Sequence, residues 1–263
     1  AGSVMQEFIL LCVILLCSSF VANAESNCTL NQYYATVCTL DADTVHFIDA
    51  YKTPNGQNNF LFRGNMPKNG DNQFAWDELK QIMTAKAAEV NMVLPSTYYL
   101  LDISLLVFVE YDDLAIEQNF FAANPTFGQV INYPLMGMCM SAQGIPDSVR
   151  LPMSTTLVDW TWDDLPTLAP SIRAHLESVR EVPTVVYIHC EAGKDRTGEV
   201  SGSYYLQYLK WDFDQVVQFN YESSPERQIS PEMLNGLQWF CYYLHDTLGY
   251  EVDCNLPSDY ITY

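Results

Sequence analysis

The strongest constraint on the fold is a continuous apolar run, Thr184 to His189 (TVVYIH), that leads directly into a short loop containing glycine. β-branched and aromatic residues without alternating polar positions are typical of a strand buried on both faces. The residues after the loop, from about Arg196 to Leu209, have the spacing of a helix. Because strands and helices alternate along the chain, we predict an α/β fold: a single domain with a central, mostly parallel sheet flanked by helices.

Other segments repeat this alternation. Asp164 suits the N-cap position of a helix and Pro166 suits its first turn, so a helix is predicted to begin there. A cluster of turn residues, Thr53-Pro54-Asn55-Gly56, ends the segment before the first clear strand. The remaining expected elements are strands at 60–63, 98–104 and 130–135, and helices at 77–90, 164–180, 213–220 and 231–248.

The first 24 residues are expected to be a cloning remnant followed by a signal peptide. Small residues precede Met5, and the apolar run 8–21 is followed by Ala22-Asn23-Ala24, a pattern that signal peptidase accepts. The run is shorter than the ~20 residues that span a bilayer. No basic residue precedes it, so a signal anchor and a buried helix are the alternatives. We divide the chain into 1–24, a lead-in at 25–58, a main domain at 59–250 and a tail at 251–263.

The cysteines fit secretion or residence in the lumen of the secretory pathway, where disulfides form. After the leader they are Cys28, Cys38, Cys139, Cys190, Cys241 and Cys254. Cys28 and Cys38 bracket a short segment, and Cys241 and Cys254 bracket the end of the last expected helix. We expect these two disulfides, with Cys139 and Cys190 outside them. Sequence alone does not fix the connectivity, and buried thiols throughout are the alternative.

Charge narrows the choice of partners. The formal net charge is −20 at pH 7, with only 12 Lys and Arg residues. Nucleic acids and anionic membrane surfaces attract basic patches, so neither is an expected partner. The oligomeric state does not follow from the sequence.

The loop after the apolar run has the residues that phosphate binding requires. Backbone amides at the start of a helix are unpaired and feel the positive end of its dipole, so a tight loop can direct several of them at one anion. Gly193 permits a positive φ, Arg196 offers a planar fork for two oxygens, and Lys194 adds a point charge. We predict a phosphate cradle formed by Glu191, Ala192, Gly193, Lys194, Asp195 and Arg196.

The same electrostatic field acts on Cys190. Cations and a helix N-terminus favour the thiolate form of a cysteine, so we expect Cys190 to attack phosphorus and form a phosphocysteine. Thr197 is placed to donate a hydrogen bond to the sulfur and assist its departure. His189 is expected to orient the loop by hydrogen bonding. An inert buried thiol is the alternative for Cys190, and it explains the neighbouring cations poorly.

The pattern H-C-x-x-G-x-x-R-T-G resembles the signature loop of the protein tyrosine phosphatase superfamily. Its Gly-Lys-Asp-Arg-Thr-Gly ending is similar to that of compact dual-specificity, bacterial-type tyrosine and phosphoinositide phosphatases. The resemblance implies a dual-specificity-phosphatase-like fold, with Cys190 as nucleophile and Arg196 as phosphate ligand. Phe62-Arg63-Gly64-Asn65 is similar to the opening strand of that superfamily, whereas residues 105–145 match no known part of it.

The superfamily also uses an aspartic acid, on a movable loop upstream of the nucleophile, as general acid. The segment 158–164 (VDWTWDD) resembles the acid loop of the phosphatases of regenerating liver, with Thr161 where those relatives have proline. We therefore predict Asp159 as the acid. Asp195 is the rival, because some relatives with a Lys-Asp-Arg loop are thought to use that position. Asp163 and Asp164 are expected to cap a helix.

These features predict a cysteine-dependent phosphomonoester hydrolase that acts on phosphotyrosine or dual-specificity protein substrates. A phosphoinositide or inositol phosphate phosphatase is the alternative, weakened by the small number of basic residues. A sulfurtransferase would need neither the acid loop nor the Arg-Thr-Gly ending. A non-catalytic module that binds phosphorylated ligands would be favoured if the nucleophile, the arginine or the acid were missing, and all three are present. The loop already meets the phosphate charge, so we expect no metal ion and no organic cofactor.

Overall fold

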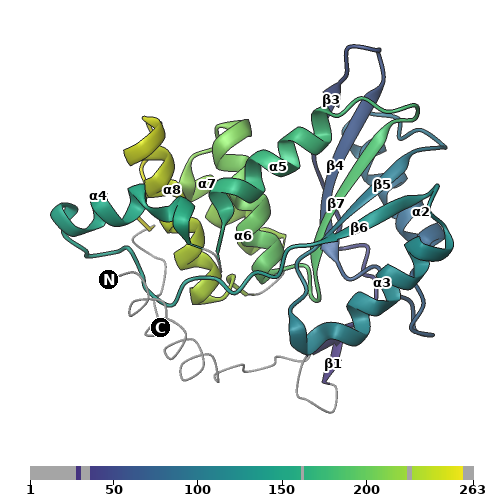
Figure 1. Cartoon of the computed structure of the whole chain (residues 1–263), viewed down its shortest axis with the longest axis horizontal. Coiled ribbons are helices and arrows are strands. Elements are labelled where there is room, and N and C mark those ends of the chain that lie inside the picture. The colour runs from purple at the N-terminus through teal and green to yellow at the C-terminus, as the bar shows by residue number, and fades with distance from the viewer. Residues whose placement is uncertain (1–27, 31–35, 161–162, 224–226, 257–263) are drawn as a thin grey trace.

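The computed structural model describes residues 28–30, 36–160, 163–223 and 227–256. Their main feature is a five-stranded sheet in the order β3-β4-β7-β5-β6 (Figure 1). The strands are β3 (His46–Lys52), β4 (Asn58–Asn65), β7 (Thr184–Cys190), β5 (Tyr99–Ser104) and β6 (Gly128–Asn132). β3 pairs antiparallel with β4, and the other pairs are parallel. The predicted α/β fold with a mostly parallel sheet is confirmed.

Strand β7 is the centre of the sheet, and all seven of its residues are buried. Its side chains alternate between two hydrophobic cores, as the pleat of a strand requires. Val186 and Ile188 pack into one core, and Val185 and Tyr187 pack into the other. The unbroken apolar run that identified this strand in the sequence therefore reflects cover on both faces.

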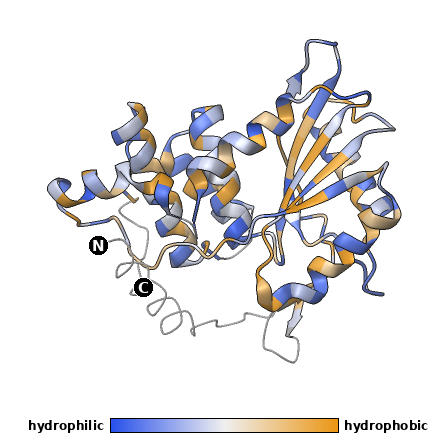
Figure 2. Cartoon of the chain, in the orientation of Figure 1, coloured by the Kyte–Doolittle hydropathy of each residue, from blue (hydrophilic) through white to orange (hydrophobic). Residues whose placement is uncertain are grey.

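Helices supply that cover (Figure 1). On one side lie α4 (Asp147–Thr155), α5 (Leu165–Glu177), α6 (Asp195–Tyr204), α7 (Phe213–Glu222) and α8 (Pro231–Leu248), and on the other lie α2 (Trp76–Glu89) and α3 (Tyr111–Ala123). Figure 2 shows apolar residues concentrated in the strands and on the helix faces toward them. Because the carboxyl ends of parallel strands meet at one edge, the loops that follow β4, β5 and β7 are brought together there.

Several elements differ from the expectation. β6 covers residues 128–132 rather than 130–135, and α5 ends at Glu177. The helix expected at 196–209 is α6 followed by a π-helical turn, Tyr205–Leu209, which ends at Lys210 with φ of 58°. Within the lead-in, β3 is an edge strand of the sheet, and the segment 105–145 contains α3. Two three-residue strands, β1 (Cys28–Leu30) and β2 (Thr36–Cys38), pair antiparallel.

Both expected disulfides are present, Cys28–Cys38 and Cys241–Cys254, with Cys139 and Cys190 as thiols. Two disulfides are consistent with an oxidising compartment. Within the described ranges, no helix has the length and apolar character needed to cross a membrane. The expected signal peptide, residues 5–24, lies outside these ranges.

Candidate active site

The loop between β7 and α6 turns sharply at Gly193, where φ is 72°. A Cβ atom at this position would lie 2.7 Å from the backbone of Gly64 and Asn65 on β4. Both the left-handed conformation and the close approach to β4 therefore require glycine here. No acceptor in the described part of the chain takes the amide hydrogens of Ala192 and Gly193. These amides are available to an anion.

Cys190 is the last residue of β7 and is 2% exposed. The hydroxyl of Thr197, in the first two turns of α6, donates a hydrogen bond to its Sγ at 3.1 Å. Thr197 is itself fully buried. A hydroxyl donor at this distance can stabilise negative charge that develops on the sulfur.

Arg63 holds the loop from behind. Its side chain is fully buried, and Nη2 donates to the carbonyl of Gly193 at 3.2 Å. Nη1 donates to Ser201 Oγ at 2.9 Å and to Asn220 Oδ1 at 2.6 Å. The Asn220 amide donates in turn to the carbonyl of Gly198 at 3.1 Å. The loop and the start of α6 are thus connected to β4 and α7 by a buried polar network.

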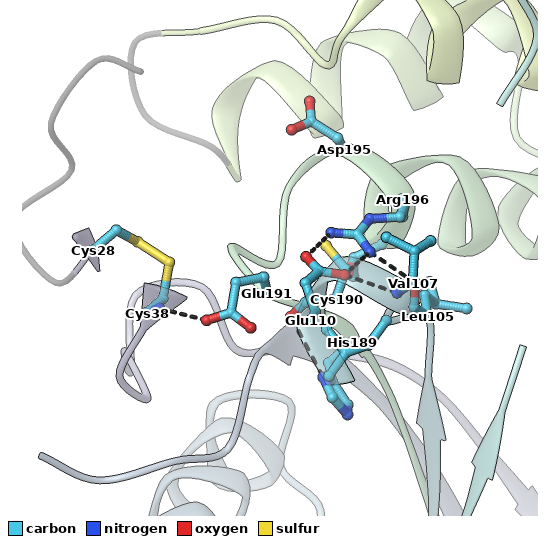
Figure 3. Close-up of polar contacts among 12 residues, drawn as sticks. Cys28, Cys38, Leu105, Val107, Glu110, His189, Cys190, Glu191, Asp195 and Arg196 are labelled. Atoms are coloured by element: carbon cyan, nitrogen blue, oxygen red, sulfur yellow. Dashed lines mark hydrogen bonds and ion pairs between the residues drawn. A yellow bond between two sulfur atoms is a disulfide. The ribbon is translucent and has the colours of Figure 1, made fainter. Parts of the chain in front are cut away.

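Arg196 is oriented by Glu110, which precedes α3 (Figure 3). Arg196 Nη1 and Nη2 each donate to one carboxylate oxygen of Glu110 at 2.6 Å, and Nη1 also donates to the carbonyl of Leu105 at 2.9 Å. A guanidinium has five N–H donors. Nε–H and one Nη2–H, on a common edge, have no acceptor within the described ranges. This edge matches two oxygens of a phosphate.

His189 lies beneath the loop in a fully buried cluster with Asp102 of β5 and Glu117 of α3. Its Nε2 lies 2.7 Å from Glu117 Oε1 and 3.1 Å from Asp102 Oδ1. Burial alone disfavours the imidazolium, but the two carboxylates outweigh it and raise the pKa of His189 well above its usual value. Nδ1 lies 3.4 Å from the carbonyl of Cys190. The cluster therefore fixes the imidazole ring directly before Cys190 in a paired, buried position.

Asp195 points away from Cys190 and Arg196 (Figure 3). Arg227 donates to both of its carboxylate oxygens, at 2.8 and 2.7 Å, and the amide of Ser230 donates at 2.7 Å. Burial would raise the pKa of Asp195, but these hydrogen bonds and the charge of Arg227 hold it below its usual value. Asp195 is thus held as a carboxylate by structural partners.

Asp159 ends a 3-10 turn, Leu157–Asp159, and its side chain is exposed. No contact among the described residues joins it to the loop 190–196. Asp164 occupies the N-cap position of α5 as expected, although without a side-chain capping hydrogen bond. Asp163 is not a cap: it is 2% exposed and shares a hydrogen bond with the buried Glu199 of α6. The segment 158–164 is therefore exposed at Asp159 and buried at Asp163.

The other predicted cradle residues lie at the loop. The Glu191 side chain points away from Arg196 and toward Cys38, whose amide donates to it (Figure 3). Only the backbone of Glu191 is therefore placed to contribute to the cradle. Lys194 is 7% exposed and comes directly before α6.

Sequence reasoning missed the residues that hold the site in place. Glu110 and Glu117 lie in the segment 105–145, which resembled nothing, and Arg227 precedes the last helix. Their positions are 86, 72 and 32 residues from the loop residues they contact. The one available signal was the presence of charged residues within 105–145, a stretch otherwise rich in apolar residues, because buried charges need partners.

Residues 116–235 match the model of a family described as the tyrosine phosphatase family. No curated protein matches the chain in sequence. Similar solved structures include Tk-PTP in a mutant form (12% identity, 70% of this chain and 91% of that chain, TM-score 0.39). Others are a mouse putative dual specificity phosphatase complexed with zinc tungstate (15%, 77% and 90%, 0.36) and PTPMT1 in complex with PI(5)P (14%, 75% and 94%, 0.35). At these TM-scores the similarity carries no functional conclusion.

Proposed function

We propose that this protein is a cysteine-dependent phosphomonoester hydrolase that acts through a phosphocysteine intermediate. The observation that carries the proposal is the contact of 3.1 Å between Thr197 Oγ1 and Cys190 Sγ, at the head of a loop in which the Ala192 and Gly193 amides have no acceptor among the described residues. The match of residues 116–235 to the tyrosine phosphatase family supports the same chemistry.

The first step transfers the phosphoryl group to sulfur. The Cys190 thiolate attacks phosphorus, and the bond between phosphorus and the ester oxygen breaks. The loop amides and the open edge of Arg196 hold the phosphate oxygens, where preorganised donors act most strongly. Asp159 protonates the leaving oxygen. The second step is attack of water on the phosphocysteine, with the Thr197 hydroxyl stabilising the departing sulfur.

Asp159 is the proposed acid because the alternative, Asp195, is already paired with Arg227. An acid must hold a proton at the working pH, and the bidentate partner of Asp195 keeps its pKa low. Asp159 is exposed, and its carboxyl group has no hydrogen bond to another described residue that would occupy it.

Phosphotyrosine or dual-specificity protein substrates are the proposed class. A polyphosphorylated inositol or a phosphoinositide would need basic residues beyond those in the loop, and the chain has 12 Lys and Arg residues against 32 Asp and Glu. A panel of phosphopeptides, phosphoinositides and inositol phosphates at equal concentration tests this. Faster turnover of the inositol compounds would reverse the assignment.

The hydrolase proposal is tested with Cys190→Ser. A serine hydroxyl is a much weaker nucleophile than a thiolate at neutral pH, so hydrolysis of an aryl phosphate should disappear while inorganic phosphate still binds. Rapid acid quench of the wild-type protein with labelled substrate should trap one phosphoryl group on Cys190. Retained turnover in the variant would disprove the mechanism, and phosphate binding without turnover in the wild type would favour a non-catalytic binding module.

A further inference from the structure

A disulfide-closed hairpin lies directly beside the proposed phosphate loop (Figure 3). β1 and β2 pair with Cys28 opposite Cys38, and these two residues form the disulfide. Cys38 is 1% exposed, although it belongs to a hairpin of two three-residue strands. An isolated two-stranded hairpin is at best marginally stable in water. Its order therefore depends on the disulfide and on its contacts with the domain.

The contact nearest the active site is made by Glu191. The backbone amide of Cys38 donates to Glu191 Oε1, and Glu191 directly follows the proposed nucleophile. Both groups are buried, so this hydrogen bond is shielded from water. The carbonyl of Glu191 accepts from the amide of Met66 at 3.1 Å. The side chain and the backbone of Glu191 are thus both fixed by residues outside the loop.

The chain after the hairpin is joined to the strand that supports the loop. The Asn65 side chain donates to the carbonyl of Thr39 at 2.7 Å and accepts from the amide of Asp41 at 2.9 Å. The amide of Leu40 donates to the carbonyl of Lys68 at 2.7 Å. Asn65 is paired with Cys190 across the sheet. These bonds hold Cys38 in register with the nucleophile.

The charge of Glu191 depends on the same contact. Its neighbours are Lys68 at 3.8 Å, Asp113, which pairs with Lys68, and Glu110. Burial, together with Asp113 and Glu110, raises the pKa of Glu191 to about 8, against the lowering effects of Lys68 and the Cys38 amide. The hairpin therefore supplies one of the two groups that stabilise this carboxylate.

We propose that the disulfide-linked strand pair of β1 (Cys28–Leu30) and β2 (Thr36–Cys38) is a positioning element for the phosphate loop and acts on it through Glu191. The proposal rests on the phosphatase function proposed above. Cys38 and Glu191 are positioning residues, since they act on the loop peptide next to Cys190 rather than on the substrate. The disulfide keeps the Cys38 amide at the distance that fixes Glu191.

One consequence is that the site needs a thiol and a disulfide at the same time. A dithiol reductant would transfer two electrons and two protons to the Cys28–Cys38 bond, giving two thiols and an oxidised reductant. Such a reductant keeps Cys190 reduced but releases the hairpin. Serine variants separate the two effects, because they remove the disulfide without any reductant.

The test compares two double variants, Cys28→Ser with Cys38→Ser, and Cys241→Ser with Cys254→Ser. The two disulfides span 10 and 13 residues, so their loss should destabilise the fold to a similar degree. At a temperature where both variants are folded, the first should bind inorganic phosphate about tenfold more weakly and lose kcat/KM to a similar extent. The second should change either quantity by less than about twofold.

Glu191→Ala should reproduce the effect of losing the hairpin disulfide, and combining it with the first double variant should cause no further loss, because both remove one contact. Glu191→Gln keeps an acceptor for the Cys38 amide and should retain most of the affinity. Equal effects of the two disulfide pairs, or additive losses in the combination, would overturn the proposal. If the first double variant does not fold, Glu191→Ala alone decides.

Binding of inorganic phosphate separates this proposal from the proposed function. A hairpin that positions the loop alters phosphate affinity whether or not the protein turns over a substrate. If the wild-type protein shows no turnover that depends on Cys190, the hydrolase proposal is disproved. The positioning role of the hairpin can still be measured through phosphate binding.

Discussion

The two sides of the proposed active site are built differently. On the nucleophile side, Cys190, Thr197 and Arg63 are almost completely buried and are held by hydrogen bonds from four elements of the fold. On the acid side, Asp159 and the neighbouring Val158 are exposed. The proposed nucleophile is fixed by the fold, whereas the proposed acid lies at the surface.

The charges that anchor the two sides also differ. Arginine and carboxylate pairs hold the loop: Arg196 with Glu110, and Arg227 with Asp195. The acid side is anchored by two carboxyl groups, Asp163 and Glu199. Both crowd Gly236 of α8, where a Cβ atom would lie 2.4 and 1.8 Å from their oxygens.

The charged groups that act on this carboxyl pair, Asp164 and Asp195, are acidic as well. Burial raises the pKa of Asp163 to about 7. Burial and the neighbouring Asp163 raise the pKa of Glu199 well above its usual value. Two such carboxyl groups side by side are stable only when they share a proton. The stability contributed by this carboxyl pair should therefore depend on pH near neutrality.

The largest expected effect tests the acid side directly. Asp159→Asn should lower kcat for an aryl phosphate with a poor leaving group by about 10²–10⁴-fold, because the leaving oxygen is no longer protonated. The alkaline limb of the pH profile should disappear with it. Steady-state rates between pH 5 and 9 measure both.

Asp195→Asn is the matched control, since it changes the rival carboxylate in the same way. It weakens the pair with Arg227 and should mainly affect stability, leaving the shape of the pH profile unchanged. A lost alkaline limb in this variant, with a normal profile for Asp159→Asn, would exchange the two roles.

A smaller loss is expected on the nucleophile side from Glu110→Gln. The amide retains one acceptor but removes the charge that fixes the Arg196 fork, and misplacement of such a group costs about 10²-fold in kcat/KM. Most of this loss in kcat/KM should appear as weaker binding of inorganic phosphate.

Glu177→Gln provides the comparison, because Glu177 also accepts from an arginine, Arg173 Nε at 2.7 Å, but in an exposed pair far along α5. Exposed pairs contribute at most about 1 kcal/mol to stability, so its kinetics should match the wild type. If both variants behave alike, Glu110 does not orient Arg196.

The contrast between the sides also explains what the sequence could predict. Strand β7, its loop and α6 follow from local patterns: an apolar run, a glycine and a helix start within 20 residues. The helix Pro231–Leu248 was predicted to the residue because Ser230 and Pro231 begin it and Gly249, with φ of 70°, ends it. Both disulfides joined cysteines close in sequence, so short loops predicted them as well.

The supporting contacts could not be predicted in this way. Glu110 meets Arg196 across 86 residues, and the Cys38 amide meets Glu191 across 153. Neither Glu110 nor Cys38 has a local pattern that names its partner, because the partner is chosen by the order of strands in the sheet. Asp163 was expected to cap α5 for the same reason: a carboxylate before a helix suits a cap, and its distant partner Glu199 leaves no sign in the sequence.

The smallest expected effect concerns stability and the anchor of the acid side. The pKa of Asp163 is raised on folding from 3.8 to about 7, so the folded protein binds a proton more tightly than the unfolded chain. This contribution to stability is fully present below about pH 4 and is lost as the pH rises to about 7.

The substitution Asp163→Asn keeps a hydrogen bond to Glu199 without the need for a proton. The variant should melt about 5 °C above the wild type at pH 8 and show little difference at pH 4. Asp164→Asn, one residue later and only partly buried, should follow the wild-type curve at both values. Calorimetric scans from pH 4 to 8 measure this, and parallel curves for wild type and Asp163→Asn would mean that the two carboxyl groups share no proton.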